Sequence, residues 1–281
     1  MTARLLIVNA DDYGLTTAVS TGILRAHRHG MVTSTSVLAV APGLARSGRW
    51  LADEADLGVG VHLAVVGEDP PLLAASEVPT LVDGRGRFAI SWRTFLGRCL
   101  AGLVDPDDIR RELTAQVEAV AGLGVVVDHL DSHQHLHMWP TLQPVVIDLA
   151  VRNGIPAIRV PRSHRRHPVS LVVNRLSARL AAAARRAGLR FADDASGVDE
   201  AGHLDRHRLL SALDGFVARG ASSAELGTHP GEAEDPDRHR YAWDYTWREE
   251  LEILLAPESR RAVEDRGFVL GTYSQLAAPS G

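Results

Sequence analysis

The chain has 281 residues, of which 45% are hydrophobic and 23% are charged, and its formal net charge at pH 7 is −5. This balance is typical of a globular protein and excludes wholesale disorder, and the length allows one large α/β domain or two ordinary ones. A mildly acidic chain is a poor general binder of nucleic acid, because that affinity comes from a basic surface that neutralises phosphates.

The residue types present exclude several kinds of chemistry. All 30 basic residues are arginines, which excludes a P-loop lysine, a Schiff-base lysine and a lysine general base. The single cysteine, Cys99, excludes internal disulfides and zinc sites built from several thiolates. The first apolar run, Leu5–Val8, is too short for a signal peptide, and no apolar run approaches 18 residues. We therefore expect a cytoplasmic protein without a membrane span.

Short apolar runs alternate along the chain with helical patterns. In chain order the predicted elements are a strand at 5–8, a helix at 16–29, a strand at 32–40, a helix at 44–55, a strand at 57–63, a helix at 106–121, a strand at 125–131, a helix at 140–152, a strand at 157–160, a helix at 171–187, a helix at 205–219, a strand at 224–228, a helix at 246–266 and a strand at 268–271. This alternation is typical of βα units around a parallel sheet, and at this length it favours a closed or nearly closed barrel.

Two segments depart from the alternation. Residues 67–90 hold three prolines and three glycines and form a long loop, which we expect to lie near the functional site. Residues 162–190 are rich in arginine, and we treat them as a candidate insertion that shapes the choice of substrate. Because no linker divides the sequence, we predict a single domain over residues 1–281.

Carboxylates and imidazoles occur at the carboxyl ends of four predicted strands. They are Asp11 and Asp12 after the first strand, His62 at the end of the third, Asp131, His133, His135 and His137 at or after the strand at 125–131, and His229 after the strand at 224–228. In a parallel α/β fold these strand ends converge on one face, where active sites are built. We therefore expect these side chains to form one site.

The segment from Asp128 to His137 contains six residues that can bind a metal. If it is extended, its odd positions share one face, because strand side chains alternate: His129, Asp131, His133, His135 and His137. A full row of buried imidazoles would be costly without partners, so only some are expected to bind a metal and the others to support ligands or substrate. Imidazole and carboxylate together suit a divalent transition metal.

Asp11, Asp12 and His229 each allow two interpretations. The aspartates could cap a turn with Tyr13-Gly14, or one could bind a metal while the other acts as general base toward a metal-activated water. His229 precedes Pro230-Gly231 and could also belong to a turn. As a functional group it would be a general acid that protonates the leaving amine of an amide.

Five blocks of the sequence have the residues of a known family, in the same order along the chain. They are Leu6–Leu15 (LIVNADDYGL), Gly30–Ser36 (GMVTSTS), Gly58–Leu63 (GVGVHL), His129–His137 (HLDSHQHLH) and Glu225–Gly231 (ELGTHPG). Together they resemble the YdjC family of carbohydrate deacetylases, also called the ChbG/HpnK family. The resemblance implies a distorted TIM-like (β/α) barrel with parallel strands. It also implies metal-dependent hydrolysis of an N-acetyl group on an amino sugar or chitooligosaccharide, with release of acetate.

The resemblance also implies roles for individual residues. Asp12, His62 and His133 would bind the metal, Asp11 would be the base and His229 the acid. It suggests Mg²⁺ as the ion and a homodimer as the assembly, whereas the ligand types alone suit Zn, Mn or Co as well. The partner would be a small acetylated sugar. Because some family members act on hopanoid-linked glucosamine, a glycolipid N-acetylglucosamine is an alternative substrate.

Hypotheses from other classes remain at this point. Two histidines and one carboxylate are also the ligands of non-haem Fe(II) oxygenases, which would require oxygen and a 2-oxo acid but would leave Asp11 and His229 without roles. A catalytically inactive sugar-binding protein would lack a base or a ligand, and purely structural histidines would bind no ion. Arg159 and Arg162 are candidates for holding an anionic or hydroxyl-rich substrate. The roles of His135 and His137 stay open.

Overall fold

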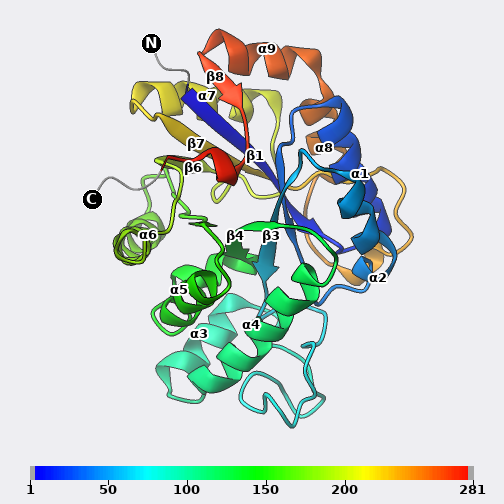
Figure 1. The fold of residues 1–281 in the computed structure, drawn as a ribbon, viewed down its shortest axis with the longest axis vertical. Coiled ribbons are helices and arrows are strands. Elements are labelled where there is room, and N and C mark those ends of the chain that lie inside the picture. Colours follow the sequence, from blue (N-terminus) through cyan, green and yellow to red (C-terminus); the bar gives the residue numbers. More distant parts are fainter. Residues whose placement is uncertain (1–3, 278–281) are drawn as a thin grey trace.

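The computed structural model describes residues 4–277, and its strands form one curved, parallel sheet (Figure 1). The strands are β1 (Arg4–Tyr13), β2 (Ser34–Val37), β3 (Gly58–Leu63), β4 (Val127–Ser132), β5 (Ala157–Ile158), β6 (Asp194–Ser196), β7 (Ser223–Thr228) and β8 (Phe268–Leu270). Their order is β5-β4-β3-β2-β1-β7-β6, and β8 pairs with the start of β1. The predicted parallel α/β barrel is confirmed in the form of a distorted half-barrel.

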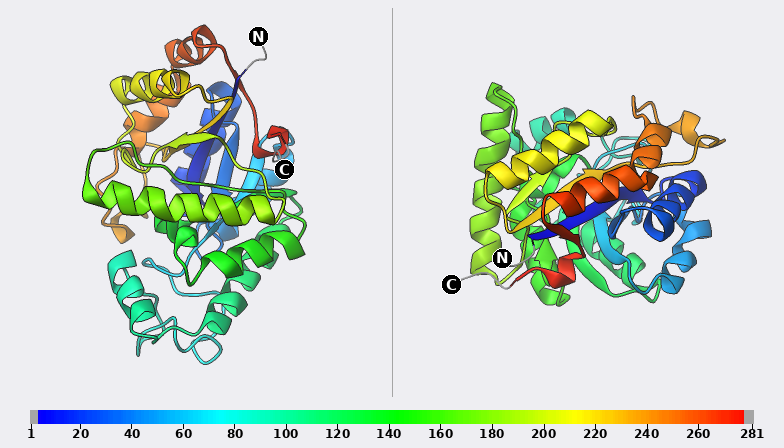
Figure 2. Two further views of the ribbon diagram at one scale, coloured as in Figure 1. Left: turned by 90° about the vertical axis from the view of Figure 1, so that its left-hand side faces the viewer. Right: turned by 90° about the horizontal axis from the view of Figure 1, so that it is seen from above.

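Helices cover the outside of the sheet. They are α1 (Thr17–His29), α2 (Leu44–Ser47), α3 (Trp92–Leu100), α4 (Pro106–Ala121), α5 (Gln143–Arg152), α6 (Pro168–Arg186), α7 (Arg206–Ala218), α8 (Trp247–Leu255) and α9 (Pro257–Asp265). Short 3₁₀ turns are η1 (Gly48–Asp53), η2 (His133–Met138), η3 (Arg238–Arg240) and η4 (Tyr273–Gln275). Helices α1, α2 and α8 lie on one flank of the sheet and α5 and α6 on the other, with α6 running across the width of that flank (Figure 2). No helix within residues 4–277 combines the length and the apolar character needed to cross a bilayer.

The best-predicted helices begin at the capping residues seen in the sequence. The Thr16 side chain accepts a hydrogen bond from the Val19 amide and so starts α1. Asp105 caps α4 in the same way through the Asp107 amide, and Pro106 occupies the first helical position. Such caps satisfy amide groups that have no partner inside the helix. The predicted helices at 16–29 and 106–121 are therefore confirmed nearly to the residue.

Other boundaries were predicted wrongly. The predicted helix at 246–266 is two helices, because Pro257 cannot continue the hydrogen bonding of α8 and holds Ala256 in an extended conformation (ψ 126°). The predicted helix at 44–55 is the single turn α2 followed by the 3₁₀ turn η1. The sequence pattern did not reveal β6 or the bounds of α3, the helix that contains Cys99.

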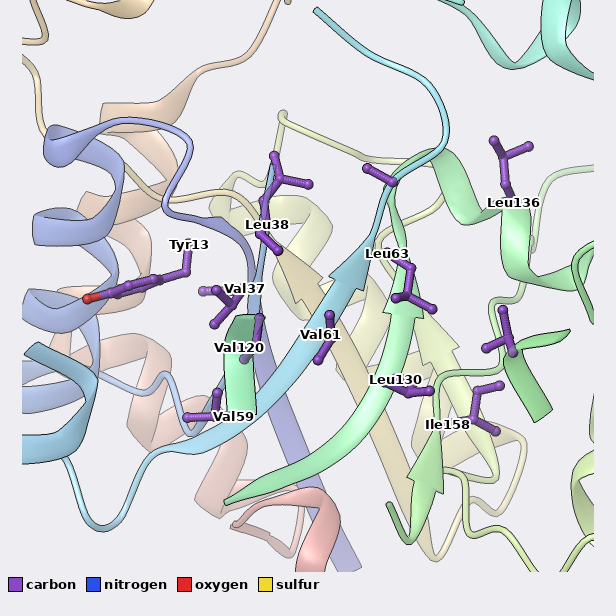
Figure 3. Close-up of a cluster of buried hydrophobic side chains, with 14 of the residues drawn as sticks. Tyr13, Val37, Leu38, Val59, Val61, Leu63, Val120, Leu130, Leu136 and Ile158 are labelled. Carbon is purple, nitrogen blue, oxygen red and sulfur yellow. The ribbon is translucent and has the colours of Figure 1, made fainter. Parts of the chain in front are cut away.

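The two faces of β3 have opposite characters. One face carries Val59, Val61 and Leu63, which pack in the core between the sheet and its helices (Figure 3). The same core contains Val120 of α4 and Leu130 of β4. The other face carries Gly60, where an added Cβ would lie 2.3 Å from the His129 ring. The glycine therefore leaves room for an imidazole inside the barrel.

The interior of the barrel has an apolar end and a polar end. A small apolar cluster fills the end near the start of β1: Ile7, Ala157, Ala192, Tyr273 and Leu276. Polar and charged residues fill the end near the carboxyl termini of the strands: Asn9, Asp11, Ser36, His62, Asp131, Arg159 and Glu225. The functional candidates of the sequence analysis belong to this polar end.

Candidate metal centre and active site

An irregularity at the end of β1 separates the carboxylates of Asp11 and Asp12. Strand β1 continues to Tyr13, so both aspartates lie within the strand, whereas they were predicted to follow it. The pairing with β2 shifts register between Ala10 and Tyr13, and Asp12 has φ 67°, in the left-handed region that aspartate tolerates better than most residues. Neighbouring side chains can therefore serve different partners, and Asp12 faces two histidines while Asp11 faces an arginine.

Asp12, His62 and His133 come together as a buried cluster. Asp12 Oδ1 lies 3.5 Å from His62 Nε2 and 3.7 Å from His133 Nδ1. One potential ligand atom from each residue lies within 4.8 Å of the other two. Ligands about 2.1 Å from a tetrahedral ion are separated by roughly 3.4 Å. The three side chains are therefore spaced to share one metal ion.

The surroundings of the cluster favour a cation. Within residues 4–277 the buried Asp12 Oδ1 has no hydrogen-bond partner, which is expensive for a carboxylate unless an ion binds it. Four buried carboxylates share this end of the barrel with one guanidinium, that of Arg159: Asp11, Asp12, Asp131 and Glu225. A divalent metal ion would offset part of the excess negative charge. The donor set of two imidazoles and one carboxylate suits such an ion.

Asp131 orients His62 for this role. His62 Nδ1 donates a hydrogen bond of 2.9 Å to Asp131 Oδ1, which leaves Nε2 directed toward Asp12. A carboxylate behind a metal-binding histidine fixes the ring and its tautomer. Burial opposes a positive charge on His62, yet Asp131 and the neighbouring aspartates raise the pKa of His62 to about 9. The position of Asp131 at this strand end was predicted, but its partnership with His62 was not.

Trp243 supports His133 from the other side. The two rings are stacked, with centroids 5.1 Å apart, and Trp243 Nε1 donates to Glu68 Oε1 at 2.9 Å. The start of the 67–90 loop is thus connected to a candidate metal ligand through one indole ring. Sequence reasoning missed Trp243, although aromatic residues at every second position from Tyr241 to Trp247 were a visible signal.

Arg159 binds carboxylates and not substrate. Its two terminal nitrogens each lie 2.7 Å from an oxygen of Asp11, and the guanidinium also pairs with Asp131 and Glu225 at 2.6 Å. Burial would raise the pKa of Asp11, but Arg159 holds it well below the usual range of aspartate. Arg162 lies elsewhere, in a separate surface cavity beside Asp194. The suggested role in substrate binding does not hold for Arg159, whose guanidinium is occupied by carboxylates, and for Arg162 it stays a prediction.

His229 completes the group around Asp11. Its Nε2 lies 3.8 Å from Asp11 Oδ2, and its Nδ1 accepts a hydrogen bond of 3.2 Å from the Gly202 amide. The ring also packs edge-on against Tyr245, with centroids 4.8 Å apart. The fold thus brings His229 close to Asp11, although the two residues are 218 positions apart in the sequence (229 − 11).

The predicted extended row of histidines ends at Ser132. The chain turns into η2 there, and Gln134 and His135 adopt left-handed φ values of 53° and 55°. His135 faces the cavity, whereas His137 turns inward and bonds Ser132 Oγ at 2.7 Å and the Arg159 carbonyl at 3.0 Å. Burial lowers the pKa of His135 to about 3 and that of His137 to about 4, so both are neutral imidazoles.

A cavity of about 580 Å³ opens above the cluster. Its floor holds Asp11, Asp12, His62, His133 and His229. Its outer wall is mostly apolar and comes from α3, η2 and α6, and it includes Trp92, Leu96, Leu136, Trp139, Val169, Val172 and Leu176. The volume is that of a small-molecule site. The candidate insertion at 162–190 is largely α6 and contributes part of this wall.

Fold and site together define a class: a parallel α/β barrel with a buried aspartate–histidine–histidine cluster, suited to a divalent metal, at the carboxyl ends of its strands. Residues 5–265 match the family model described as YdjC-like protein. The chain belongs to this family, as the five sequence blocks indicated.

Relatives and a solved structure match the chain along nearly its whole length. It is 32% identical over 283 residues to a chitooligosaccharide deacetylase of Proteus mirabilis, covering 98% of this chain and 99% of the relative. It is 32% identical to a carbohydrate deacetylase of Geobacillus stearothermophilus, covering 97% and 98%. A crystal structure from Enterococcus faecalis, titled for cellobiose-phosphate cleavage, superposes with a TM-score of 0.80 at 27% identity and covers 97% and 98%.

Proposed function

We propose that this protein is a metal-dependent carbohydrate N-deacetylase, which removes the acetyl group from an acetylated amino sugar of the chitooligosaccharide type and releases acetate. The observation that carries the proposal is the Asp12–His62–His133 cluster, with the carboxylate of Asp11 beside it, on the floor of a cavity of small-molecule size. Family membership and relatives named as deacetylases of carbohydrates and chitooligosaccharides support it.

The metal would be held by Asp12, His62 and His133. When bound, a divalent ion lowers the pKa of a coordinated water towards about 7 and polarises a carbonyl oxygen. We propose Mg²⁺ on the family resemblance, with Zn, Mn and Co as alternatives that the two imidazole ligands favour. Asp131 would keep the His62 ring in the orientation that binding requires.

Asp11 would act as the general base. Because Arg159 keeps this carboxylate ionised, it can accept a proton from the attacking water throughout the neutral pH range. The same ion pair makes protonated Asp11 a strong acid, which favours passing the proton on. One carboxylate can thus receive a proton early in the reaction and give it up later.

His229 would act on the leaving nitrogen. Water oxygen bonds to the acetamide carbonyl carbon, the carbon–nitrogen bond breaks, and acetate and the free amine leave. The amine takes a proton from His229 on the cavity side, and His229, whose Nε2 lies 3.8 Å from Asp11, regains from Asp11 the proton that the water lost. This division of roles uses every polar group on the cavity floor, whereas an Fe(II) oxygenase would leave Asp11 and His229 without function.

Finer features of the proposal come from the sequence pattern and, for the assembly, from the resemblance. They are a single catalytic domain over residues 1–281, a homodimeric assembly and a cytoplasmic location. Light scattering on the purified protein tests the dimer, and cell fractionation tests the location.

The test of the activity is direct. The purified protein is stripped of metal, loaded with Mg²⁺, Mn²⁺, Co²⁺ or Zn²⁺, and incubated with N-acetylglucosamine oligomers of defined length while acetate is measured. We expect acetate release that depends on the metal. An absence of acetate with every metal and oligomer, or oxygen uptake that requires a 2-oxo acid, would contradict the proposed function.

A further inference from the structure

Glu250 is a buried acid that the proposed mechanism leaves without a role. It lies on α8 and is 1% exposed. Its Oε2 accepts a hydrogen bond of 2.6 Å from the backbone amide of His229, and its Oε1 accepts one of 2.9 Å from the amide of Leu204. One carboxylate therefore joins two loops that are far apart in the sequence.

The loop that carries Leu204 also holds the imidazole of His229. The Gly202 amide donates to His229 Nδ1 at 3.2 Å. The Gly202 carbonyl accepts from both the amide and the hydroxyl of Thr246, at 2.7 and 3.1 Å. Gly202 has φ 73°, and a Cβ there would lie 2.0 Å from the Tyr245 ring. A side chain at this position would collide with the Tyr245 ring, so only glycine can bring its amide within hydrogen-bond distance of His229.

These contacts decide which nitrogen of His229 carries hydrogen. A ring nitrogen that accepts a hydrogen bond has no hydrogen of its own, so in the neutral ring the hydrogen is on Nε2. Nε2 is the nitrogen that faces Asp11, at 3.8 Å. This arrangement requires the backbone of His229 and the amide of Gly202 to keep their relative positions. Glu250 accepts a hydrogen bond from the His229 amide, and it holds Gly202 indirectly through the amide of Leu204.

We propose that Glu250 is a positioning residue: it holds the His229 backbone and the 202–204 loop together so that His229 keeps the tautomer with hydrogen on Nε2, directed at Asp11. The proposal rests on the proposed deacetylation for its effect on rate, because that reaction gives His229 the task of donating to the leaving amine. The tautomer itself can be observed without any substrate.

The first experiment measures the tautomer in the wild-type protein. Metal-loaded protein, with diamagnetic Mg²⁺ or Zn²⁺, is labelled with ¹⁵N in histidine, and two-bond ¹H–¹⁵N correlations are recorded near neutral pH. His229→Gln identifies the His229 signals. We expect the pattern of a ring protonated at Nε2. A ring protonated at Nδ1 would overturn the proposal.

The second experiment changes Glu250 alone. Glu250→Gln replaces one acceptor oxygen by an NH₂ group, which cannot accept a hydrogen bond from a backbone amide. We expect the single tautomer to be lost and kcat for acetate release to fall roughly tenfold or more, with KM within about twofold, since the affected step is proton donation. The matched control is Glu252→Gln, because Glu252 lies on the same helix, is 59% exposed and pairs only with Arg248 among the described ion pairs.

The outcomes separate the two proposals. Wild-type kcat and tautomer in Glu250→Gln, or an equal loss in Glu252→Gln, would overturn the role of Glu250. If Glu250→Gln does not fold, the wild-type spectrum decides, because hydrogen on Nδ1 contradicts the proposal and hydrogen on Nε2 supports it. A protein that shows the Nε2 tautomer but never releases acetate would contradict the deacetylase proposal and not the arrangement around His229.

Discussion

The two ends of the barrel interior are built from the same strands with opposite chemistry. Strand β1 supplies Ile7 to the apolar cluster at one end and Asp11 to the charged group at the other. Residues 7, 9 and 11 share one face of the strand, because side chains alternate. The apolar end is held by the removal of hydrocarbon from water, and the charged end is held by the pairing of opposite charges.

This difference explains where chemistry can occur. Burying Ile7 among apolar neighbours is favourable by itself, so that end contributes stability without any ligand. Burying the carboxylates around Arg159 is costly and is offset only by well-placed partners. The charged end therefore holds groups whose charges are not fully balanced, and these are the groups that can bind a metal and transfer protons.

The largest effect is expected from removing a candidate metal ligand. In His133→Ala we expect metal binding to be lost and acetate release to fall on the order of 10³-fold or more, since metal activation of water contributes several kcal/mol to the rate. Metal content by elemental analysis and acetate release are measured together. The control is His207→Ala, an exposed histidine on α7. Normal metal content in His133→Ala would remove this residue from the ligand set.

A nearly equal effect on rate, without an effect on metal binding, is expected at Asp11. Asp11→Asn keeps the size of the side chain but removes the base, so we expect turnover to fall by about 10²- to 10⁴-fold while the metal stays bound. Calorimetric metal titration and acetate release distinguish the two. Turnover at the wild-type rate would show that Asp11 is not the base.

The apolar end should respond in the opposite way. Ile7→Ala removes fully buried hydrocarbon, so we expect the free energy of unfolding to fall by about 2–5 kcal/mol with metal affinity unchanged. Denaturant unfolding of the metal-free protein measures this. Leu171→Ala, on the exposed surface of α6, is the control and should have little effect. If Ile7→Ala weakened metal binding strongly, the two ends of the barrel would not be independent.

The smallest effect is expected from changing Asp131, which contacts the candidate ligand His62 and lies outside the proposed set of metal ligands. Asp131→Asn can no longer hold the His62 ring as a carboxylate does, and we expect metal affinity to fall by roughly 10- to 100-fold without complete loss. The control is Asp128→Asn on β4, because Asp128 is equally buried but bonds to His129, outside the cluster. Equal losses in both variants would mean that general disturbance of β4, and not the orientation of His62, is responsible.

Much of this organisation could be predicted from residue patterns. The alternation of apolar runs and amphipathic segments indicated a parallel α/β barrel, and carboxylates and imidazoles at several strand ends indicated one shared site. Caps such as Thr16 and Asp105 located helix starts, because their side chains act on amides only a few residues away. These signals are local or periodic, and they can be read without knowing the distant neighbours.

The wrong predictions concern features that depend on distant contacts. The extended row of histidines failed because the chain turns after Ser132, with His137 bonded to the backbone of Arg159. Arg159 was a candidate for substrate binding because nothing in its own neighbourhood showed that Asp11 and Glu225 surround it. Glu250 gave no signal at all, since both of its partners are backbone amides of other segments.

The amino-acid sequence by itself determined the class of fold, the family and the residue types available for metal and proton chemistry, since these follow from periodicity, composition and short motifs. Only the tertiary structure decided which carboxylates surround the guanidinium of Arg159, and which nitrogen of each imidazole points into the cavity. The reason is physical: the orientation of side chains and the balance of charge at a buried site are set by groups from distant segments. These groups lie about 3–4 Å apart in the fold, and their separation along the chain does not reveal that contact.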